Sequence, residues 1–532
     1  MKKLNFTFFL QVTIFFACFS AGLAFAGDFD FGDDFSSGFE GDFGGFEDGG
    51  GSFSGNSLAV TGEAEINFRG YFDAEDEFGL ALDEWKTESV PKGKISLNYS
   101  NSTVPAVSAD AKFAFNKEIL EKYREDVIDE LTLEACLGNF VVQAGKMKVV
   151  WGKGDKLHVL DNFNANDYRD FILPDYIDRR ISEPMVRVLY NVPKDAGPFS
   201  STRFEFVWTP AMTADRYAET GRWVPAQVAA LKSELTKLGG ETIVGQSLKS
   251  AKAKKAWLEA SDESEKNDAL AVAKQQEALY TTMLSNSSSV AEGLYPDTRQ
   301  LKYMQAGFRF TTTTGSFDWG LSYYAGRSKQ ASFDKSRMNS FVSRQLAEGS
   351  TSDDEKFIDY DFLQVFGFEA AKTLGAYNFR AEGAYNLTKD TAGDDPTVQN
   401  NSLGWIFGFD RDLPVSELNL NLQLQGKYIL NHDKIKDLGN LDTESSTFEN
   451  DNKIVVNISD SWNHGKVKPE VTAVYGFQHY DLIVMPKLTW YVSDGLEFSA
   501  RGMYMASYKS DKTEFEGWHN NGFVQFGAKY TF

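Results

Sequence analysis

The side chains that could support catalysis are few and widely spaced. The chain has five histidines, and His158 is the one that lies between two acidic residues, Asp155 and Asp161. A hydrolase needs a histidine held beside a serine or an aspartate, and no such arrangement recurs as a motif. Complete calcium loops and glycine-rich nucleotide motifs are also missing from the sequence. We therefore predict that the protein is not an enzyme and has no catalytic site, no metal site and no cofactor.

Basic residues offer a different chemistry, the recognition of anions. Lys146 and Lys148 are two residues apart, so a strand would place both on one face and Met147 with Val149 on the other, facing lipid. Rings of lysine and arginine are the usual device for passing anions through a pore. The predicted lumen and constriction residues are Lys146, Lys148, Arg169, Arg179, Arg180, Arg187 and Arg380. The alternative is that they pair with Asp155, Asp161, Asp167 and Asp178 and hold a loop in place.

The N-terminal residues indicate export. Lys2 and Lys3 precede an apolar stretch that closes on Ala24-Phe25-Ala26, which is the pattern of a secretory signal peptide over residues 1–26. A lipoprotein site at Cys18 is the weaker alternative. Cleavage after Ala26 removes two lysines and no acids, so the formal charge moves from −22 to −24. The mature chain keeps one cysteine, Cys136, and cannot form an internal disulfide.

The rest of the sequence is dominated by strand periodicity. Between Leu418 and Tyr428, leucines alternate with polar residues at strict period two. The last strand, 521–532, alternates in the same way and ends on Phe532, which resembles the sorting signal read by the outer-membrane assembly machinery. Such alternation over about ten residues is typical of a transmembrane β-barrel. We therefore predict an all-β, antiparallel outer-membrane β-barrel over residues 57–532, in contact with outer-membrane lipid.

The alternation predicts about eighteen strands, with sixteen as the alternative. Tight-turn sequences such as Gly138-Asn139, Gly315-Ser316 and Ser493-Asp494-Gly495 predict short connections at one end of the barrel. A soluble β-sandwich or propeller would also alternate, but it would leave aromatic residues at strand ends unexplained. We expect these aromatics to form a girdle at the membrane interface: Tyr71, Trp151, Trp208, Trp405, Trp490 and Tyr508.

Two segments do not fit a barrel wall. Residues 27–56 contain seven Phe, ten Gly and eight acids without a basic residue, a composition that predicts a disordered tail. Residues 226–290 are rich in Ala, Lys, Glu and Leu with helical spacing, which predicts a helical insertion within the barrel. The tail could be a tether, a docking peptide or a plug, and the helices could cap the barrel or meet a partner.

A third segment, Lys146 to Arg180, carries a resemblance. Its Trp151-Gly152 with Asp155, its Asn/Asp-rich run 160–170, and the later segments 207–225 and 305–326 resemble an uncharacterised family of large outer-membrane barrels associated with RND-type exporters. Ala165 departs from this family, which favours Pro there. The resemblance implies a porin-like barrel and a periplasmic or RND-type export partner.

Two functions remain for such a barrel. The first is a channel or transport protein that passes solutes or amphipathic molecules, and the predicted inward faces carry a slight excess of basic residues that favours anionic cargo. The second is a surface adhesin or structural outer-membrane protein. With a net charge of −22 we expect no nucleic-acid partner.

Overall fold

The structure, a computed structural model of the chain, describes residues 57–71, 86–101, 105–155, 157–170, 176–508 and 521–532, together with Thr513 and Trp518. The predicted signal peptide (1–26) and acidic tail (27–56) lie outside the described residues. None of the helices in these ranges is both long and apolar enough to cross a membrane.

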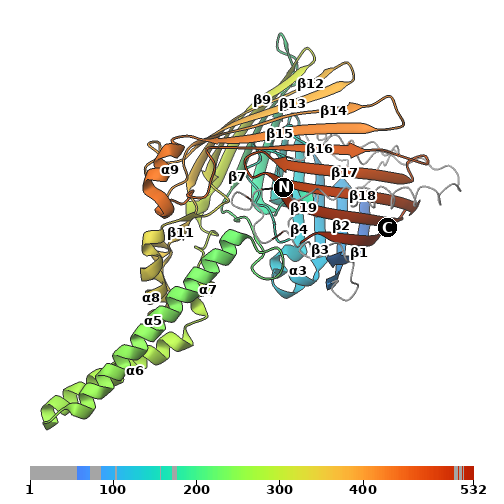
Figure 1. The fold of residues 1–532 in the computed structure, drawn as a ribbon. Coiled ribbons are helices and arrows are strands. Elements are labelled where there is room, and N and C mark those ends of the chain that lie inside the picture. The colour runs from blue at the N-terminus through green and yellow to red at the C-terminus, as the bar shows by residue number, and fades with distance from the viewer. Residues whose placement is uncertain are drawn as a thin grey trace.

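Strands account for most of the described chain (Figure 1). The long strands are β1 (Ser57–Tyr71), β2 (Lys86–Asn101), β3 (Ala106–Asn116), β4 (Ile128–Leu137), β5 (Phe140–Met147), β6 (Glu183–Asn191), β7 (Phe199–Thr209), β8 (Gln305–Thr314), β9 (Phe317–Arg327), β12 (Phe362–Leu374), β13 (Tyr377–Leu387), β14 (Ser402–Asp412), β15 (Asn419–Ile429), β16 (Asn450–Ser459), β17 (Val467–Gly476), β18 (Asp481–Ser493), β19 (Leu496–Ser507) and β20 (Phe523–Thr531). Two further strands of two residues each, β10 (Ser332–Phe333) and β11 (Ile358–Asp359), pair with one another within a long connection.

The long strands form one closed antiparallel sheet. β1 pairs with β2 on one side and with β20 on the other, and β9 pairs directly with β12. Every strand therefore has two hydrogen-bonded neighbours, and no edge is left unpaired. Within the described residues this confirms the predicted β-barrel and its count of eighteen strands.

Side chains alternate between the two faces of the wall, as the sequence predicts. On β20, Phe526 is 52% exposed, whereas its neighbour Gln525 is buried on the inner face. On β15, Asn421 and Gln423 are buried inside, and Leu422 lies on the opposite face. Large exposed apolar side chains recur around the outer face on β1, β4, β7, β12 and β20. The outer surface is therefore apolar, and the inner face of β15 and β20 carries polar side chains.

The predicted aromatic girdle is only partly correct. Trp208, Trp490 and Tyr508 are exposed. Tyr71 and Trp151 are buried, at 4% and 1% exposure. Tyr71 packs with Ala218 and Trp223 of a long connection, and Trp151 packs within its own connection and against the strands. Both were placed at the rim because alternation alone does not reveal when a loop turns inward.

The two ends of the barrel differ. At one end of the barrel, which we call the short-turn end, the connections include the two-residue turns Gly138-Asn139 and Gly315-Ser316. Both glycines have a positive φ, which favours a tight turn. At the other, the long-loop end, lie the connections 148–182, 210–304, 328–361 and 430–449. Phe532 reaches the short-turn end, where its backbone exchanges hydrogen bonds with Gly62.

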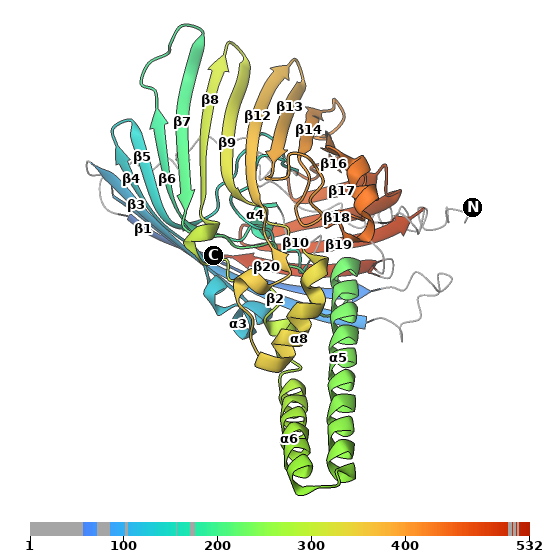
Figure 2. The ribbon, with the colours of Figure 1, turned by 90° about the vertical axis from the view of Figure 1, so that its left-hand side faces the viewer.

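Helices lie in the connections of the long-loop end. The two longest are α5 (Ala226–Glu259) and α6 (Glu263–Ser285), which form a hairpin that projects away from the barrel (Figure 2). Its base packs on α8 (Met338–Glu348) around Leu235, Met283 and Phe341. The shorter helices are α3 (Lys117–Glu121), η2 (Arg124–Val127), α4 (Tyr176–Arg179), α7 (Ser289–Glu292), η3 (Leu301–Tyr303), η4 (Lys335–Arg337), η5 (Asp353–Glu355), α9 (His432–Leu438) and η6 (Gly439–Leu441).

Candidate functional site

The connection between β5 and β6 folds into the barrel, and we call its described residues, 148–155, 157–170 and 176–182, the inserted loop. Its apolar side chains Val149, Trp151, Leu160 and Phe163 are almost fully buried. They pack against inward-facing residues of six strands, namely Met147, Met185, Val207, Tyr324, Val365 and Ala384. The inserted loop therefore fills one side of the interior with a hydrophobic core of its own.

The orientation predicted for β5 is wrong at its end. Met147 and Val149 do not face outward, because both are buried in the core beneath the inserted loop. Lys146 pairs across the sheet with Leu131 and Pro184, and directly opposed residues share one face. Leu131 is exposed on the outer face, so Lys146 lies there too, at the rim.

A single asparagine joins the two ends of the inserted loop. Asn164 accepts a hydrogen bond from the backbone of Val149 (2.8 Å) and donates to the carbonyls of Met147 (3.1 Å) and Ile181 (2.9 Å). These backbone groups would otherwise be buried without partners, which costs about 1–3 kcal/mol each. Asn164, within the Asn/Asp-rich run of the sequence, therefore holds the two ends of the inserted loop together.

A chain of buried charges supports the core from the barrel wall. The indole nitrogen of Trp151 donates to Glu205 at 3.1 Å, and Glu205 also pairs with Arg187 at 2.6 Å and with Arg309 at 3.5 Å. Arg309 pairs further with Glu369 at 2.7 Å. Because each buried charge has an opposite neighbour, the cost of removing these groups from water is offset.

The innermost part of the inserted loop is held by Glu382 of β13. Its carboxylate accepts hydrogen bonds from the backbone of Gly154 (2.6 Å) and Val159 (2.9 Å), and it lies 3.3 Å from the ring of His158. At Gly152, whose φ is +112°, an added Cβ would lie 2.2 Å from the same carboxylate. The Trp-Gly sequence therefore has a physical cause: the tryptophan fills the core and the glycine lets Glu382 approach.

The tip of the inserted loop meets strands on the far side of the barrel. Asp155 forms ion-pair and hydrogen-bond contacts with Arg380 and Asn421, and Arg380 also pairs with Asp410 at 3.0 Å. Burial raises the pKa of Asp155, and the guanidinium of Arg380 opposes that rise. The backbone nitrogen of Leu157 donates to Gln423 of β15.

Most of the other predicted constriction residues are paired with acids. Lys148 donates to Asp129 at 3.1 Å, Arg180 pairs with Asp161 at 2.6 Å, and Arg187 is part of the buried chain. Arg169 contacts Asp167 and lies over the ring of Tyr123, while Arg179 lies 6.0 Å from the ring of Tyr168. The pairing that the sequence left open as an alternative is therefore observed for Arg169, Arg180 and Arg380.

A second segment crosses the long-loop end of the barrel. Trp223 donates a hydrogen bond to the hydroxyl of Tyr71 at 3.3 Å. Trp518 donates to the carbonyl of Val224 at 2.8 Å, and Asn521 donates to that of Arg222. These contacts join the start of the 210–304 connection to strands β1 and β18–β20. Together with the inserted loop, this segment covers part of the long-loop end.

The interior beside β1–β4 and β20 is open by comparison. Lys94, Lys112 and Lys529 lie on the inner face, and their side chains are 40%, 50% and 33% exposed. Each pairs with an acid on a neighbouring strand, Glu63, Glu130 and Glu497 respectively, and Lys94 also pairs with Asp178 of the inserted loop at 2.9 Å. In contrast, Arg309 and Glu369 on the opposite wall are 1% exposed. The inner wall is therefore packed around Arg309 and Glu369 and accessible around Lys112 and Lys529, whereas Asn67, Arg69 and Gln525, nearer the long-loop end of β1 and β20, are buried.

Besides Arg187 and Arg380, which the sequence suggested, the inserted loop is held by residues that sequence reasoning did not single out. Glu205, Arg309, Glu369 and Glu382 could be recognised only as inward-facing charges. The sequence feature that could have identified them is their position in the middle of a strand, on its inward-facing side. Within the described ranges, no group of three or more His, Cys, Asp or Glu side chains could hold a metal ion.

Comparisons with known proteins give a limited picture. No protein-family model matches the chain, and no curated relative matches it. Among solved structures, it is similar to the outer-membrane channel DcaP of Acinetobacter baumannii, with 10% identity over 90% of this chain and 99% of that one and a TM-score of 0.38. It is also similar to a mutant of the Rh. blastica porin, with 8% identity over 90% and 100% of the two chains and a TM-score of 0.36. A likeness at this level adds nothing to what the strand topology establishes.

Proposed function

We propose that this protein is an outer-membrane channel that passes solutes through the part of the barrel that the inserted loop leaves open. The observation that carries the proposal is the contrast between the two inner walls. Lys112 and Lys529 are accessible on one side, whereas Arg309 and Glu369 are buried on the other. A barrel of eighteen strands is wide enough to enclose an aqueous passage.

The apolar outer face supports the membrane location. In lipid every backbone group must be paired, and a closed barrel meets that requirement. The final strand β20 pairs with both β1 and β19, so it completes the closure. We propose that the assembly machinery recognises this strand. Deleting the last ten residues should abolish assembly into outer membranes, and normal insertion of that truncated chain would contradict the proposal.

A more specific part of the proposal concerns the kind of solute that passes through the channel. The accessible lysines of the open wall, Lys94, Lys112 and Lys529, support a preference for anionic or amphipathic anionic solutes. Their acidic partners reduce the field that they create in the lumen, so we propose a mild preference rather than strict selection. An RND-type export partner in the periplasm follows from the family resemblance, and cross-linking of the tagged barrel in cells would detect or refute it.

A second function, a surface adhesin, is favoured by the α5–α6 hairpin. It projects from the barrel (Figure 2) and carries exposed apolar residues, among them Val244, Leu248 and Leu258. Such residues on a projecting surface are typical of protein contacts. An adhesin would need the hairpin but would not need an open lumen.

Single-channel conductance separates the two functions. The mature chain, refolded and inserted into a planar bilayer, should give discrete current steps. Variants that lack residues 27–56 or residues 226–290 show whether the tail or the helical insertion changes the current. A correctly folded barrel that passes no ions, in any of the three forms, would contradict the channel and leave the adhesin.

A further inference from the structure

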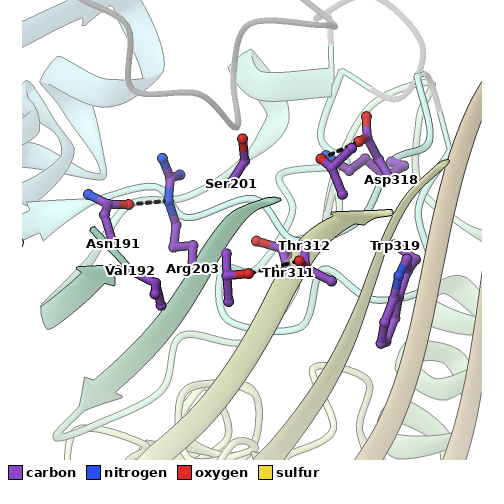
Figure 3. Close-up of a pocket in the computed structure, with 11 residues that line it drawn as sticks. Asn191, Val192, Ser201, Arg203, Thr311, Thr312, Asp318 and Trp319 are labelled. Atoms are coloured by element: carbon purple, nitrogen blue, oxygen red, sulfur yellow. Dashed lines mark hydrogen bonds between the residues drawn. The ribbon is translucent and has the colours of Figure 1, made fainter. Parts of the chain in front are cut away.

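A recess of about 190 Å³ lies in the barrel wall where β7 meets β8, towards the short-turn end (Figure 3). The register between these strands shifts between Ser200 and Arg203, and Ser201 has a left-handed φ of +51°. Such a bulge leaves an extra residue unpaired and bends the strand. The recess is therefore created by a local irregularity of the wall, and bulges of this kind often re-aim side chains at functional sites.

Charged and hydroxyl side chains line the recess. Arg203 of β7 and Lys153 of the inserted loop supply two positive charges, and Asp318 of β9 supplies one negative charge. Figure 3 shows Arg203 with Asn191 on one side, Asp318 with Trp319 on the other, and Ser201 between them. The hydroxyl residues of the lining are Ser201, Thr202, Thr311, Thr312 and Thr313. Thr312 and Thr313 already donate to Ser200 and Asp318, and Thr202 is hydrogen-bonded to Thr312. The site therefore combines a net positive charge with the hydroxyls of Ser201 and Thr311.

The arginine is held in a fixed orientation. Its Nε donates to the side-chain oxygen of Asn191 at 2.9 Å. Arg203 is two residues from Glu205 on the same strand, and Glu205 lies on the inner face with Arg187, so Arg203 also faces the lumen. A preoriented guanidinium loses less entropy when it binds a ligand. On the other side, the hydroxyl of Thr313 donates to Asp318 at 2.6 Å.

We infer that this recess binds a small oxyanion, either a free ion or the terminal carboxylate or phosphate of a larger solute. The planar guanidinium of Arg203 matches the geometry of such groups. Lys153 adds a second positive charge, and the hydroxyls of Ser201 and Thr311 supply further hydrogen bonds. Asp318 repels an anion and so limits its affinity, which favours release during transport. The inference rests on the proposed passage, because the lumen is the route by which a solute reaches Arg203.

Isothermal titration of the refolded mature barrel with inorganic phosphate, and separately with acetate, tests the inference. Arg203→Gln should weaken binding about tenfold, the loss expected for a charge-assisted hydrogen bond. Asp318→Asn should tighten it, because a repulsive charge is removed. Arg501→Gln is the matched control, since it removes the same charge from the inner face of β19, away from the recess, and should leave binding unchanged. Heat-modifiable migration confirms that each variant is folded.

The outcomes separate the recess from the passage. Binding that survives Arg203→Gln, or binding that both Arg203→Gln and Asp318→Asn weaken, overturns the oxyanion assignment. No binding of either probe to the wild-type barrel also overturns it, even if the barrel conducts. A barrel that binds the probe in the predicted way but carries no current refutes the passage and leaves the binding site standing. The two probes distinguish a phosphate site from a carboxylate site.

Discussion

The indole of Trp151 donates a hydrogen bond to Glu205 at 3.1 Å, deep inside the barrel. This contact links the hydrophobic core of the inserted loop to the buried charges of the wall, because Glu205 also pairs with Arg187 and Arg309. Removing one partner of a buried ion pair is strongly destabilising, by about 3–5 kcal/mol. The part of the inserted loop around Trp151 is therefore anchored to the barrel wall.

The first prediction concerns the anchor of the inserted loop. Glu382→Ala removes the acceptor of two backbone hydrogen bonds from Gly154 and Val159, so the tip of the loop should detach from β13. We expect a larger and noisier single-channel conductance than in the wild type. Glu497→Ala removes an equal charge from the open wall and serves as the control. A conductance that both variants change equally would contradict the anchoring role of Glu382.

The second prediction concerns ion selectivity. Lys112 is half exposed on the inner wall, whereas Lys146 lies at the rim on the outer face and donates to the carbonyls of Glu125 and Ile128. Reversal potentials across a salt gradient should therefore shift towards cations in Lys112→Glu and stay unchanged in Lys146→Glu. The opposite order would restore the constriction that the sequence suggested around Lys146.

The third prediction concerns the register of β15. Leu422 faces outward, so Leu422→Arg should destabilise the barrel by about 2–4 kcal/mol, the cost of a charge on the lipid face. Unfolding in urea measures this change in free energy. Gln423 is unsuitable as the silent control, because it is buried beneath the inserted loop, where it accepts a hydrogen bond from Leu157. Gln425→Arg, also on the inner face, is the better control and should cost less.

The fourth prediction concerns pH. Burial disfavours the charged form of Asp178, but the ammonium of Lys94, 2.9 Å away, outweighs it and lowers the pKa of this carboxyl. A lowered pKa means that the contact stabilises the fold above the unfolded pKa of about 4 and is lost as the pH falls further. Proteolysis near α4 should therefore rise below that pH. In Asp178→Asn, cleavage should be high throughout and independent of pH, and a wild-type profile in this variant would contradict the prediction.

The strands were predictable because their pattern is local. Lipid on one side and polar groups on the other impose period two, and the long strands follow it apart from local irregularities such as the bulge in β7. The prediction of which side chains face lipid was wrong at the end of β5, beneath the inserted loop. Met147 and Val149 continue the alternation of β5, so they looked lipid-facing, but an apolar residue can face inward where an apolar loop covers it. Period two shows that two faces differ, and it does not show which one is inside.

The candidate site was less predictable because its contacts are distant in sequence. Gly154 meets Glu382 across more than two hundred residues, and the pairing of Asp155 with Arg380 is equally remote. Sequence spacing identified the basic residues and offered acids that could neutralise them. It could not decide between free and paired charges, because that depends on the path of one loop through the interior.

The length of α5 has a practical consequence for establishing which way the protein faces. With thirty-four residues and a rise of 1.5 Å each, this helix extends about 50 Å, more than the thickness of a bilayer's hydrocarbon core, about 30 Å. Its connection to α6, at Ala260 and Ser261, stands well clear of the barrel. An antibody epitope inserted there would be a topological marker: staining of intact cells would assign the long-loop end to the exterior, and staining only after permeabilisation would assign it to the periplasm.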